Sequence, residues 1–311
     1  MSLVDVGLIL VGLLLIIKAS ELAINSLLRI ASEFGITEFT AGFLVIGIAS
    51  VLPELSLGLA SSLEGASSLG LGVIFGSNVA DLTLILGIVA VYAGGVKLES
   101  KTLQSNLYFL FVTALPVLLA FDGEISRLDG VVLLLAFGYY VYRIVEERKS
   151  FSKTLDDLRK HKSDFFDQVV IAAFAIGVMF LAAYMVSNAA INISAALQLP
   201  LVVLGAVIAF GTCLPELSFS LQSLRENHPE LGLGDIMGNV IVDCTATLGV
   251  IALVNPIRVA GGEALAIGLV MVAATLLSVL FMKTGARLSR REGVVLILAY
   301  VVFLAFQFIG R

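Results

Sequence analysis

Apolar runs long enough to cross a membrane follow one another along the whole chain, separated by short polar segments. An α-helix needs about 20 predominantly apolar residues to span the hydrocarbon core of a bilayer. Runs of this kind lie near 3–28, 38–63, 69–93, 104–121, 127–146, 165–195, 200–224, 231–254, 262–282 and 292–310. The pattern therefore predicts an all-α polytopic membrane protein with ten transmembrane helices.

Composition indicates the same class. Hydrophobic residues make up 59% of the sequence, charged residues only 14%, and the mean hydropathy is +1.05, whereas about a quarter of the residues of a soluble domain are charged. The sequence has no basic patch interleaved with aromatic residues, so nucleic acid is not an expected partner. The expected partner is the lipid bilayer. The first apolar run has no basic segment before it and no clear cleavage site, so we expect a retained helix there.

The lysine and arginine residues predict the orientation. Fifteen of them lie in the segments after the first, third, fifth, seventh and ninth predicted helices, and three lie in the remaining segments and at the ends. Cytoplasmic loops carry the excess of these residues. We therefore expect a multi-pass protein of the cell membrane with both termini outside. Lys18 lies inside the first predicted helix, and we expect it to pair with Glu21 rather than to join a transport site.

The second half of the chain repeats part of the first. Residues 52–87 align with residues 214–249 at a constant offset of 162 without gaps, and 18 of the 36 positions are identical. The sequence thus predicts a first five-helix repeat at 1–146, a cytoplasmic linker at 147–164 and a second five-helix repeat at 165–311. Because five is odd, the repeats enter the membrane from opposite sides. Inverted repeats of this kind are the architecture of many secondary transporters.

Four acidic residues occupy matching positions inside the apolar runs of the two repeats. Glu54 and Glu216 lie in the second and seventh predicted helices, and Asp81 and Asp243 lie in the third and eighth. An ionised acid at bilayer depth costs several kcal/mol unless it meets a cavity, a partner or an ion. A structural alternative is that these acids are protonated or hydrogen-bonded to serine and threonine. Their pairing between the repeats favours an ion-binding role.

Pro53 and Pro215 stand immediately before the two glutamates. Proline has no N–H group and clashes with the carbonyl four residues earlier, so we expect both helices to be broken or unwound there. Irregular backbone at membrane depth is tolerated around a cavity or an ion. Each break would offer backbone oxygens, a hydroxyl group from Ser50 or Thr212, and a carboxylate. An all-oxygen, anionic site of this kind suits a hard cation such as Ca²⁺ or Na⁺.

Other chemistry has weaker support. Cys213 and Cys244 lie in apolar runs and are expected to be small buried residues without a disulfide. A Zn²⁺ or Cu⁺ site is disfavoured, since no histidine lies in a predicted helix. Residues 232–235 spell the Gly-x-Gly-Asp motif of intramembrane aspartyl proteases, but the Tyr-Asp pair of those enzymes does not occur in the sequence. Asp235 is expected at the head of the eighth helix, and its repeat partner is Val73. The sequence therefore predicts that the protein is not an enzyme.

The duplicated segments resemble the α-repeats of the Ca²⁺:cation antiporter superfamily, most closely those of prokaryotic Na⁺/Ca²⁺ exchangers. The family motif is Gly-Thr-Ser-Leu-Pro-Glu, followed about 20 residues later by Gly-Ser-Asn-x-x and then Asn or Asp. This chain has Ala-Ser-Val-Leu-Pro-Glu at 49–54 and Gly-Ser-Asn-Val-Ala-Asp at 76–81. The second repeat has Gly-Thr-Cys-Leu-Pro-Glu at 211–216 and Gly-Asn-Val-Ile-Val-Asp at 238–243.

The resemblance implies a ligand set for the transported ions. Glu54 and Glu216 would be the central Ca²⁺ ligands, and Asp81 and Asp243 would lie beside the site. Further oxygens would come from residues at family ligand positions, namely the backbone oxygens of Ser50 and Thr212 at Ca²⁺, Ser77 at a Na⁺ position, and the carbonyls of Gly47 and Ala209.

Some positions depart from the family pattern. Val51 and Cys213 replace motif serines, and Asn239, a further candidate ligand, replaces a serine of the second repeat. The resemblance implies that the hydroxyl groups of the family's serines help to bind Na⁺, so this chain lacks some of the usual Na⁺ ligands. Asp81 stands where many Na⁺/Ca²⁺ exchangers have asparagine, and clustered carboxylates in a low dielectric hold protons more readily.

The leading prediction is a secondary active antiporter that exchanges Ca²⁺ for Na⁺ by alternating access. Exchange of Ca²⁺ for H⁺ is a serious alternative. A passive cation channel is a weaker one, because the internal inverted repeat indicates a self-contained monomer, whereas a channel usually needs oligomeric symmetry around a pore. No cofactor is expected besides the transported ions.

Overall fold

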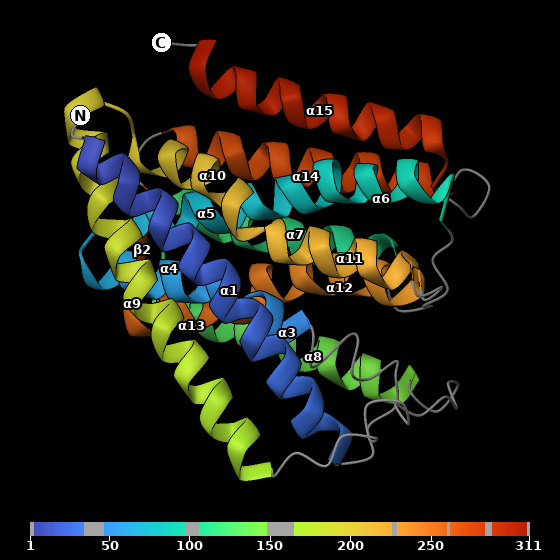
Figure 1. The fold of residues 1–311 in the computed structure, drawn as a ribbon. Helices are drawn as coiled ribbons and strands as arrows, with labels where there is room; N and C mark the ends of the chain where they lie inside the picture. Colours follow the sequence, from blue (N-terminus) through green and yellow to red (C-terminus); the bar gives the residue numbers. More distant parts are fainter. Residues whose placement is uncertain are drawn as a thin grey trace.

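The computed structural model is built almost entirely of helices (Figure 1). It describes residues 3–33, 47–96, 106–147, 165–225, 229–259, 262–283 and 288–309. The helices are α1 (Leu3–Glu33), α3 (Gly47–Ser50), α4 (Leu52–Leu63), α5 (Ser67–Ala80), α6 (Leu86–Ala93), α7 (Asn106–Leu119), α8 (Arg127–Glu147), α9 (Phe165–Leu197), α10 (Leu201–Thr212), α11 (Leu214–Arg225), α12 (Pro229–Val242), α13 (Leu248–Val254), α14 (Gly262–Lys283) and α15 (Arg290–Ile309). Two π-helical turns, η2 (Asp81–Ile85) and η6 (Asp243–Thr247), join α5 to α6 and α12 to α13. A short 3-10 turn, η3 (Ala120–Asp122), follows α7.

The prediction of an all-α, multi-pass membrane protein is confirmed. Within the described residues, six helical stretches are long and apolar enough to cross a membrane, and two shorter apolar stretches, Gly47–Leu63 and Tyr108–Asp122, fall at predicted spans. The number of ten helices stays a prediction, since residues 38–46 of the second predicted span lie outside the described part of the chain. Residues 148–164 of the predicted linker lie outside it as well.

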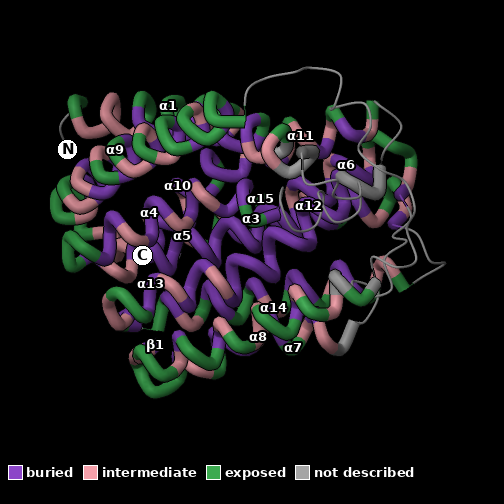
Figure 2. Tube along the Cα trace, turned by 90° about the horizontal axis from the view of Figure 1, so that it is seen from below, coloured by how far each residue is buried: buried purple, intermediate pink, exposed green. Residues whose placement is uncertain are grey.

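The core is carried by one long stretch from each half of the chain. In Ser67–Ala93 and Gly232–Val254, 89% and 83% of the most apolar window is buried. The corresponding shares are only 22% for Leu3–Leu27 and 33% for Phe165–Leu197, and Figure 2 shows exposed positions along α1 and α9. Exposed apolar surface of this extent suits contact with lipid. The two buried stretches, which contain Asp81 and Asp243, are thus enclosed by helices whose outer faces are apolar.

Helices of one half pack against helices of the other at very close range. A Cβ atom on Gly72 of α5 would lie 2.0 Å from the carbonyl oxygen of Val202 on α10. A Cβ atom on Gly205 of α10 would lie 2.3 Å from the carbonyl oxygen of Leu69. Both distances are far inside van der Waals contact, so only glycine fits at this crossing. The contact of α3 with α12 occupies the corresponding place in the other half.

A second pair of crossings repeats this arrangement. Helix α6 packs on α15 and helix α13 packs on α8. A Cβ atom on Gly293 would lie 2.8 Å from the carbonyl oxygen of Gly87, and one on Gly130 would lie 2.9 Å from that of Gly249. Gly87 and Gly249 are equivalent positions of the sequence repeat. The two halves therefore interlock through equivalent contacts, as expected of related repeats.

Short backbone pairings connect loops of the two halves. Strand β1 (Glu124–Ile125) pairs antiparallel with β2 (Ile257–Arg258), and Val96 forms an isolated bridge with Leu288. The first pairing joins two loops that the charge pattern places outside, and the second joins two loops that it places in the cytoplasm. The structure thus pairs loops within each predicted set.

Candidate functional site

Both proline-containing helices are interrupted where the sequence predicts a break. The first interruption separates α3 from α4 at Val51, and the second separates α10 from α11 at Cys213. Both residues keep a near-helical backbone, with φ −77° and ψ −2° at Val51 and φ −80° and ψ −1° at Cys213. The N–H groups of Leu55 and Leu217 donate to the carbonyls of Val51 and Cys213 at 2.9 and 3.1 Å. Each interruption is therefore a single-residue kink and not an unwound segment.

Asp81 and Asp243 each begin a π-helical turn, which the sequence patterns did not indicate. The hydroxyl groups of Thr83 and Thr245, two residues after the acids, each donate to the backbone carbonyl four residues earlier at 2.5 Å. Turns of this type are rare and occur frequently at functional sites. The wider turn changes the direction in which the following residues point, and it occurs at the same place in both repeats.

The two aspartates are hydrogen-bonded across the interface between the repeats. The Ser77 hydroxyl donates to Asp243 Oδ2 at 3.1 Å, and the Asn239 amide donates to Asp81 Oδ2 at 3.2 Å. Ser77 and Asn239 are equivalent positions, so each repeat holds the aspartate of the other. The same Asn239 amide also reaches Glu216 Oε1 at 3.5 Å. One hydroxyl and one amide therefore hold three of the four predicted acids at the interface, in two groups of hydrogen bonds.

All four predicted acids are buried. Glu54, Asp81 and Asp243 are 0% exposed, and Glu216 is 1% exposed. In the described part of the chain, six buried carboxylate oxygens have no hydrogen-bond partner: both of Glu54 and one each of Asp81, Glu216, Asp235 and Asp243. The buried polar residues of the same part include no lysine, arginine or histidine. A buried carboxylate without a positive partner is costly, so the cluster requires cations or protons.

Glu54 lies within electrostatic reach of the other acids although it forms no hydrogen bond with them. It interacts with Asp81, Glu216 and Asp243, and its neighbour from the second repeat is Thr212. Among the described residues, no three Asp, Glu, His or Cys side chains form a ready metal site by themselves. The oxygens gathered at this interface come from carboxylates, hydroxyl groups and an amide together.

The remaining predicted ligands lie at the same interface, and some of their oxygens already have hydrogen-bond partners. The Thr212 hydroxyl donates to the Ala209 carbonyl at 3.1 Å, and the Cys213 N–H donates to the same carbonyl at 3.1 Å. The Ala209 carbonyl is therefore engaged within its own helix. Gly47 packs on α12, where a Cβ atom would lie 3.8 Å from the backbone carbon of Gly238.

Asp235 is a member of the site that sequence reasoning missed. It was expected at the head of the eighth helix, but α12 begins at Pro229 and Asp235 is 0% exposed within it. The Ser50 hydroxyl donates to Asp235 Oδ1 at 3.1 Å and lies 3.4 Å from Asn239 Oδ1. The available signal was the position of Asp235 one helical turn before Asn239, which places both side chains on one face.

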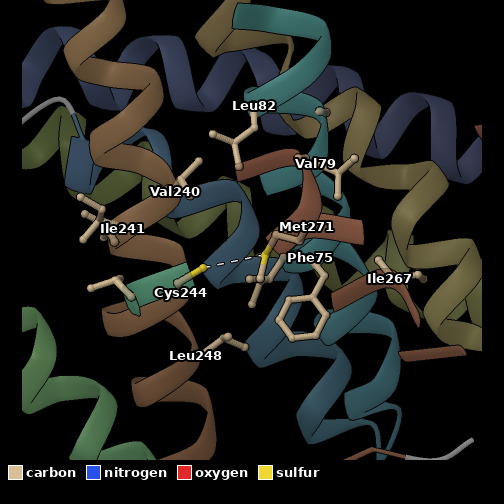
Figure 3. Close-up of a cluster of buried hydrophobic side chains, with 14 of the residues drawn as sticks. Phe75, Val79, Leu82, Val240, Ile241, Cys244, Leu248, Ile267 and Met271 are labelled. Atoms are coloured by element: carbon tan, nitrogen blue, oxygen red, sulfur yellow. Dashed lines mark hydrogen bonds between the residues drawn. The ribbon is translucent and has the colours of Figure 1, made fainter. Parts of the chain in front are cut away.

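The two cysteines are free and buried, as predicted. The Cys213 thiol lies 3.7 Å from the Ser77 carbonyl, so it reaches the edge of the acidic network. The Cys244 thiol lies 3.9 Å from the Met271 sulfur, within an apolar cluster that also contains Phe75 (Figure 3), and its sulfur accepts a hydrogen bond from the Asn78 amide at 3.4 Å. Val51, the other departure from the family motif, belongs to the same cluster. The cluster is the main hydrophobic core of the described residues, and it also includes Cys213.

Lys18 lies apart from the site, as predicted. Its ammonium group is 2.8 Å from Glu21 Oε2, and its side chain is 74% exposed. The pair lies on α1, which packs against α9 at the periphery of the bundle (Figure 1). An exposed pair of this kind contributes little to stability and leaves the charge of the acidic network uncompensated.

The fold and the site together define a class of membrane transporter. Two interlocked repeats with a buried anionic cluster at their interface are the architecture of a secondary cation antiporter. The chain belongs to the sodium/calcium exchanger protein family, whose model matches residues 4–145 and 168–309. The resemblance to the Ca²⁺:cation antiporter superfamily is thereby confirmed.

Known relatives agree with this assignment over nearly the whole chain. The sodium/calcium exchanger MaX1 of Methanosarcina acetivorans is 27% identical over 350 residues, covering 96% of this chain and 97% of the relative. A solved structure of the sodium-calcium exchanger NCX_Mj superposes with a TM-score of 0.67 at 27% identity, covering 98% of this chain and 99% of that chain. The H⁺/Ca²⁺ exchanger CAX superposes with a TM-score of 0.78 at 17% identity, covering 98% and 83%, which is a likeness of fold alone.

Proposed function

We propose that this protein is a secondary active antiporter of the cell membrane that moves Ca²⁺ in exchange for Na⁺ by alternating access. The observation that carries the proposal is the cluster of repeat-equivalent acids at the interface. Their carboxylates are buried, several of their oxygens have no partner, and no buried lysine, arginine or histidine balances them among the described residues. A transported cation is the partner that this arrangement lacks.

The proposed Ca²⁺ ligands are the carboxylates of Glu54 and Glu216, which follow the two kinks. Ca²⁺ takes six to eight oxygen ligands, so neighbouring oxygens must contribute. We assign the additional oxygens to the other residues of the site: Asp81, Asp243, Ser50, Thr212, Ser77, Gly47, Ala209 and Asn239. The cross-repeat hydrogen bonds support this set because they bring its members to one place from both halves.

Exchange follows from a shared site. An empty cluster of buried carboxylates is strongly unfavourable, so the protein should reorient only when Ca²⁺ or the counter-cation neutralises it. Movement of one group of helices against the other would then expose the same site to each side in turn.

Protons are the second candidate counter-cation. The observation that favours protons is the replacement of two family serines by residues without a hydroxyl group. Val51 lies in the apolar cluster, and Asn239 offers an amide whose N–H₂ group already donates to two acids. A site with fewer free hydroxyl oxygens is a poorer Na⁺ site and retains carboxylates that can accept protons.

Transport by proteoliposomes distinguishes the two. We expect uptake of radioactive Ca²⁺ into vesicles loaded with Na⁺ and diluted into Na⁺-free buffer at equal pH, with no uptake into vesicles loaded with choline. Uptake that follows an imposed pH difference and ignores Na⁺ would replace Na⁺ by H⁺ as the counter-cation. If Ca²⁺ uptake depends on neither a Na⁺ nor an H⁺ gradient and is accompanied by ionic conductance, the protein is a channel and the antiporter proposal is overturned.

The proposal includes the organisation of the chain. We propose that residues 1–146 and 165–311 are the two repeats joined by a cytoplasmic linker at 147–164, with both termini outside, as the charge pattern predicts. We further propose that one chain is sufficient for transport and that the protein needs no cofactor and has no enzymatic activity, because the two halves already supply both sides of the site.

A further inference from the structure

The two sides of the site differ at one buried position. Residue 235 of the second repeat is aspartate, and its equivalent in the first repeat, Val73, is an apolar residue that is also 0% exposed. Asp235 contacts Ser50 on α3, and it interacts electrostatically with Asp81 and Glu216. The four acids predicted from the sequence obey the repeat, whereas this fifth acid breaks it. One side of the interface therefore carries an additional carboxyl group.

Among the described residues around Asp235, hydrogen-bond acceptors outnumber donors. The Ser50 hydroxyl has one proton, and it lies 3.1 Å from Asp235 Oδ1 and 3.4 Å from Asn239 Oδ1. The Asn239 amide N–H₂ group is directed to Asp81 and Glu216, so its oxygen faces Ser50. The second oxygen of Asp235 has no hydrogen-bond partner in the described part of the chain. Several oxygens thus converge with a single hydroxyl proton among them.

The equivalent place in the other half lacks the additional carboxyl group. The Thr212 hydroxyl, which corresponds to that of Ser50, donates to the Ala209 carbonyl of its own helix. The Ser77 hydroxyl, which corresponds to the Asn239 amide, lies 3.1 Å from Asp243 Oδ2 and 2.9 Å from the Ile74 carbonyl oxygen, which share its one proton. Val73 adds no oxygen there. The two halves therefore differ by one buried carboxyl group and by the partners of their hydroxyl groups.

We infer that Ser50, Asp235 and Asn239 form an additional cation subsite beside the carboxylates of the proposed Ca²⁺ position. One carboxylate with a hydroxyl and an amide oxygen suits a small hard monovalent cation, for which we take Na⁺. The subsite lies between α3 of the first repeat and α12 of the second, and the repeat equivalent of its carboxylate is the apolar Val73. It supplies oxygens for the counter-cation where the family's serines are replaced. The inference rests on the proposed function.

Competition between Na⁺ and Ca²⁺ tests the subsite. In proteoliposomes, we expect Asp235→Asn to raise the half-inhibitory Na⁺ concentration for Ca²⁺ uptake at least tenfold more than it raises the KM for Ca²⁺. The asparagine keeps the size of the side chain and still accepts a hydrogen bond from Ser50. If Asp235 had a purely structural role, the half-inhibitory Na⁺ concentration and the KM for Ca²⁺ would therefore change in proportion or not at all. The repeat-equivalent control, Val73→Ala, should leave the ratio of the two constants within twofold.

Each outcome decides the inference. If Na⁺ does not compete with Ca²⁺ in the unmodified protein, the Na⁺ part of the proposed function fails and the subsite fails with it. If Na⁺ competes in the unmodified protein but Asp235→Asn shifts neither constant, or both in proportion, only the subsite is overturned. Should the Asp235→Asn protein not be recovered in folded form, Ser50→Ala removes the hydroxyl alone, and the same selective loss of Na⁺ competition is expected. An unchanged ratio in Ser50→Ala would overturn the subsite.

Discussion

Replacing Glu216 or Glu54 by glutamine is expected to reduce Ca²⁺ uptake at least 100-fold, which corresponds to about 3 kcal/mol of lost ion-binding free energy. Glutamine preserves the shape of the side chain and, at 216, still offers an oxygen to the Asn239 amide. The loss therefore measures the charge of the carboxylate and not the packing around it. Initial rates of radioactive Ca²⁺ uptake into proteoliposomes, normalised to the amount of reconstituted protein, check the prediction.

A matched control for this substitution is Glu64→Gln. Glu64 caps the C-terminus of α4, the helix that has Glu54 in its first turn, and it is exposed. We expect Glu64→Gln to transport at a rate within twofold of the unmodified protein. The structural alternative, in which the buried acids only hold the helices together, predicts the reverse pattern. Glu54→Gln would then lower thermal stability and leave the transport rate per folded molecule unchanged.

Replacing Gly72 by alanine is expected to destabilise the protein more than any other single methyl group added at a described glycine. The new Cβ atom would lie 2.0 Å from the carbonyl oxygen of Val202, so helices α5 and α10 must move apart. Overpacking of a buried contact costs about 1–3 kcal/mol and sometimes more. The midpoint of thermal unfolding in detergent, followed by size-exclusion chromatography, should fall by several degrees or the folded peak should disappear.

The control for Gly72→Ala lies in a helix at the lipid-facing surface. A Cβ atom on Gly177, in the middle of α9, would meet no atom within 4 Å. Gly177→Ala should therefore leave the unfolding midpoint unchanged or raise it, because alanine favours a helix by about 1 kcal/mol over glycine. Equal midpoints for the two variants would show that the α5–α10 contact is not as close as described.

The spans and the four equivalent acids could be predicted because hydropathy and the repeat are local properties of the sequence. The kinks followed from Pro53 and Pro215 by the same local reasoning, although their extent did not. The pairing of Ser77 with Asp243 and of Asn239 with Asp81 could not be predicted. Each pair joins residues about 160 positions apart, and only the packing of one repeat on the other brings them together.

Asp235 shows a different limit of sequence reasoning. Its four-residue motif is typical of protease chemistry, and the repeat offers no acidic partner at Val73, so the sequence alone assigns Asp235 no place in the ion site. Its role depends on α3, whose Ser50 reaches it from the other half of the chain. A comparison of the repeats finds what the halves share and passes over a residue that only one half has. The asymmetry of the site therefore becomes visible only in the folded molecule.

The central claim is that Ca²⁺ and its counter-cation occupy one shared site at the repeat interface. Equilibrium binding of radioactive Ca²⁺ to the purified protein, titrated with Na⁺ at constant ionic strength, tests it most directly. We predict that Na⁺ raises the apparent Kd for Ca²⁺ without changing the number of sites, and that binding is lost in both Glu54→Gln and Glu216→Gln. Full Ca²⁺ binding at saturating Na⁺, or binding that survives in either variant, would contradict the shared site.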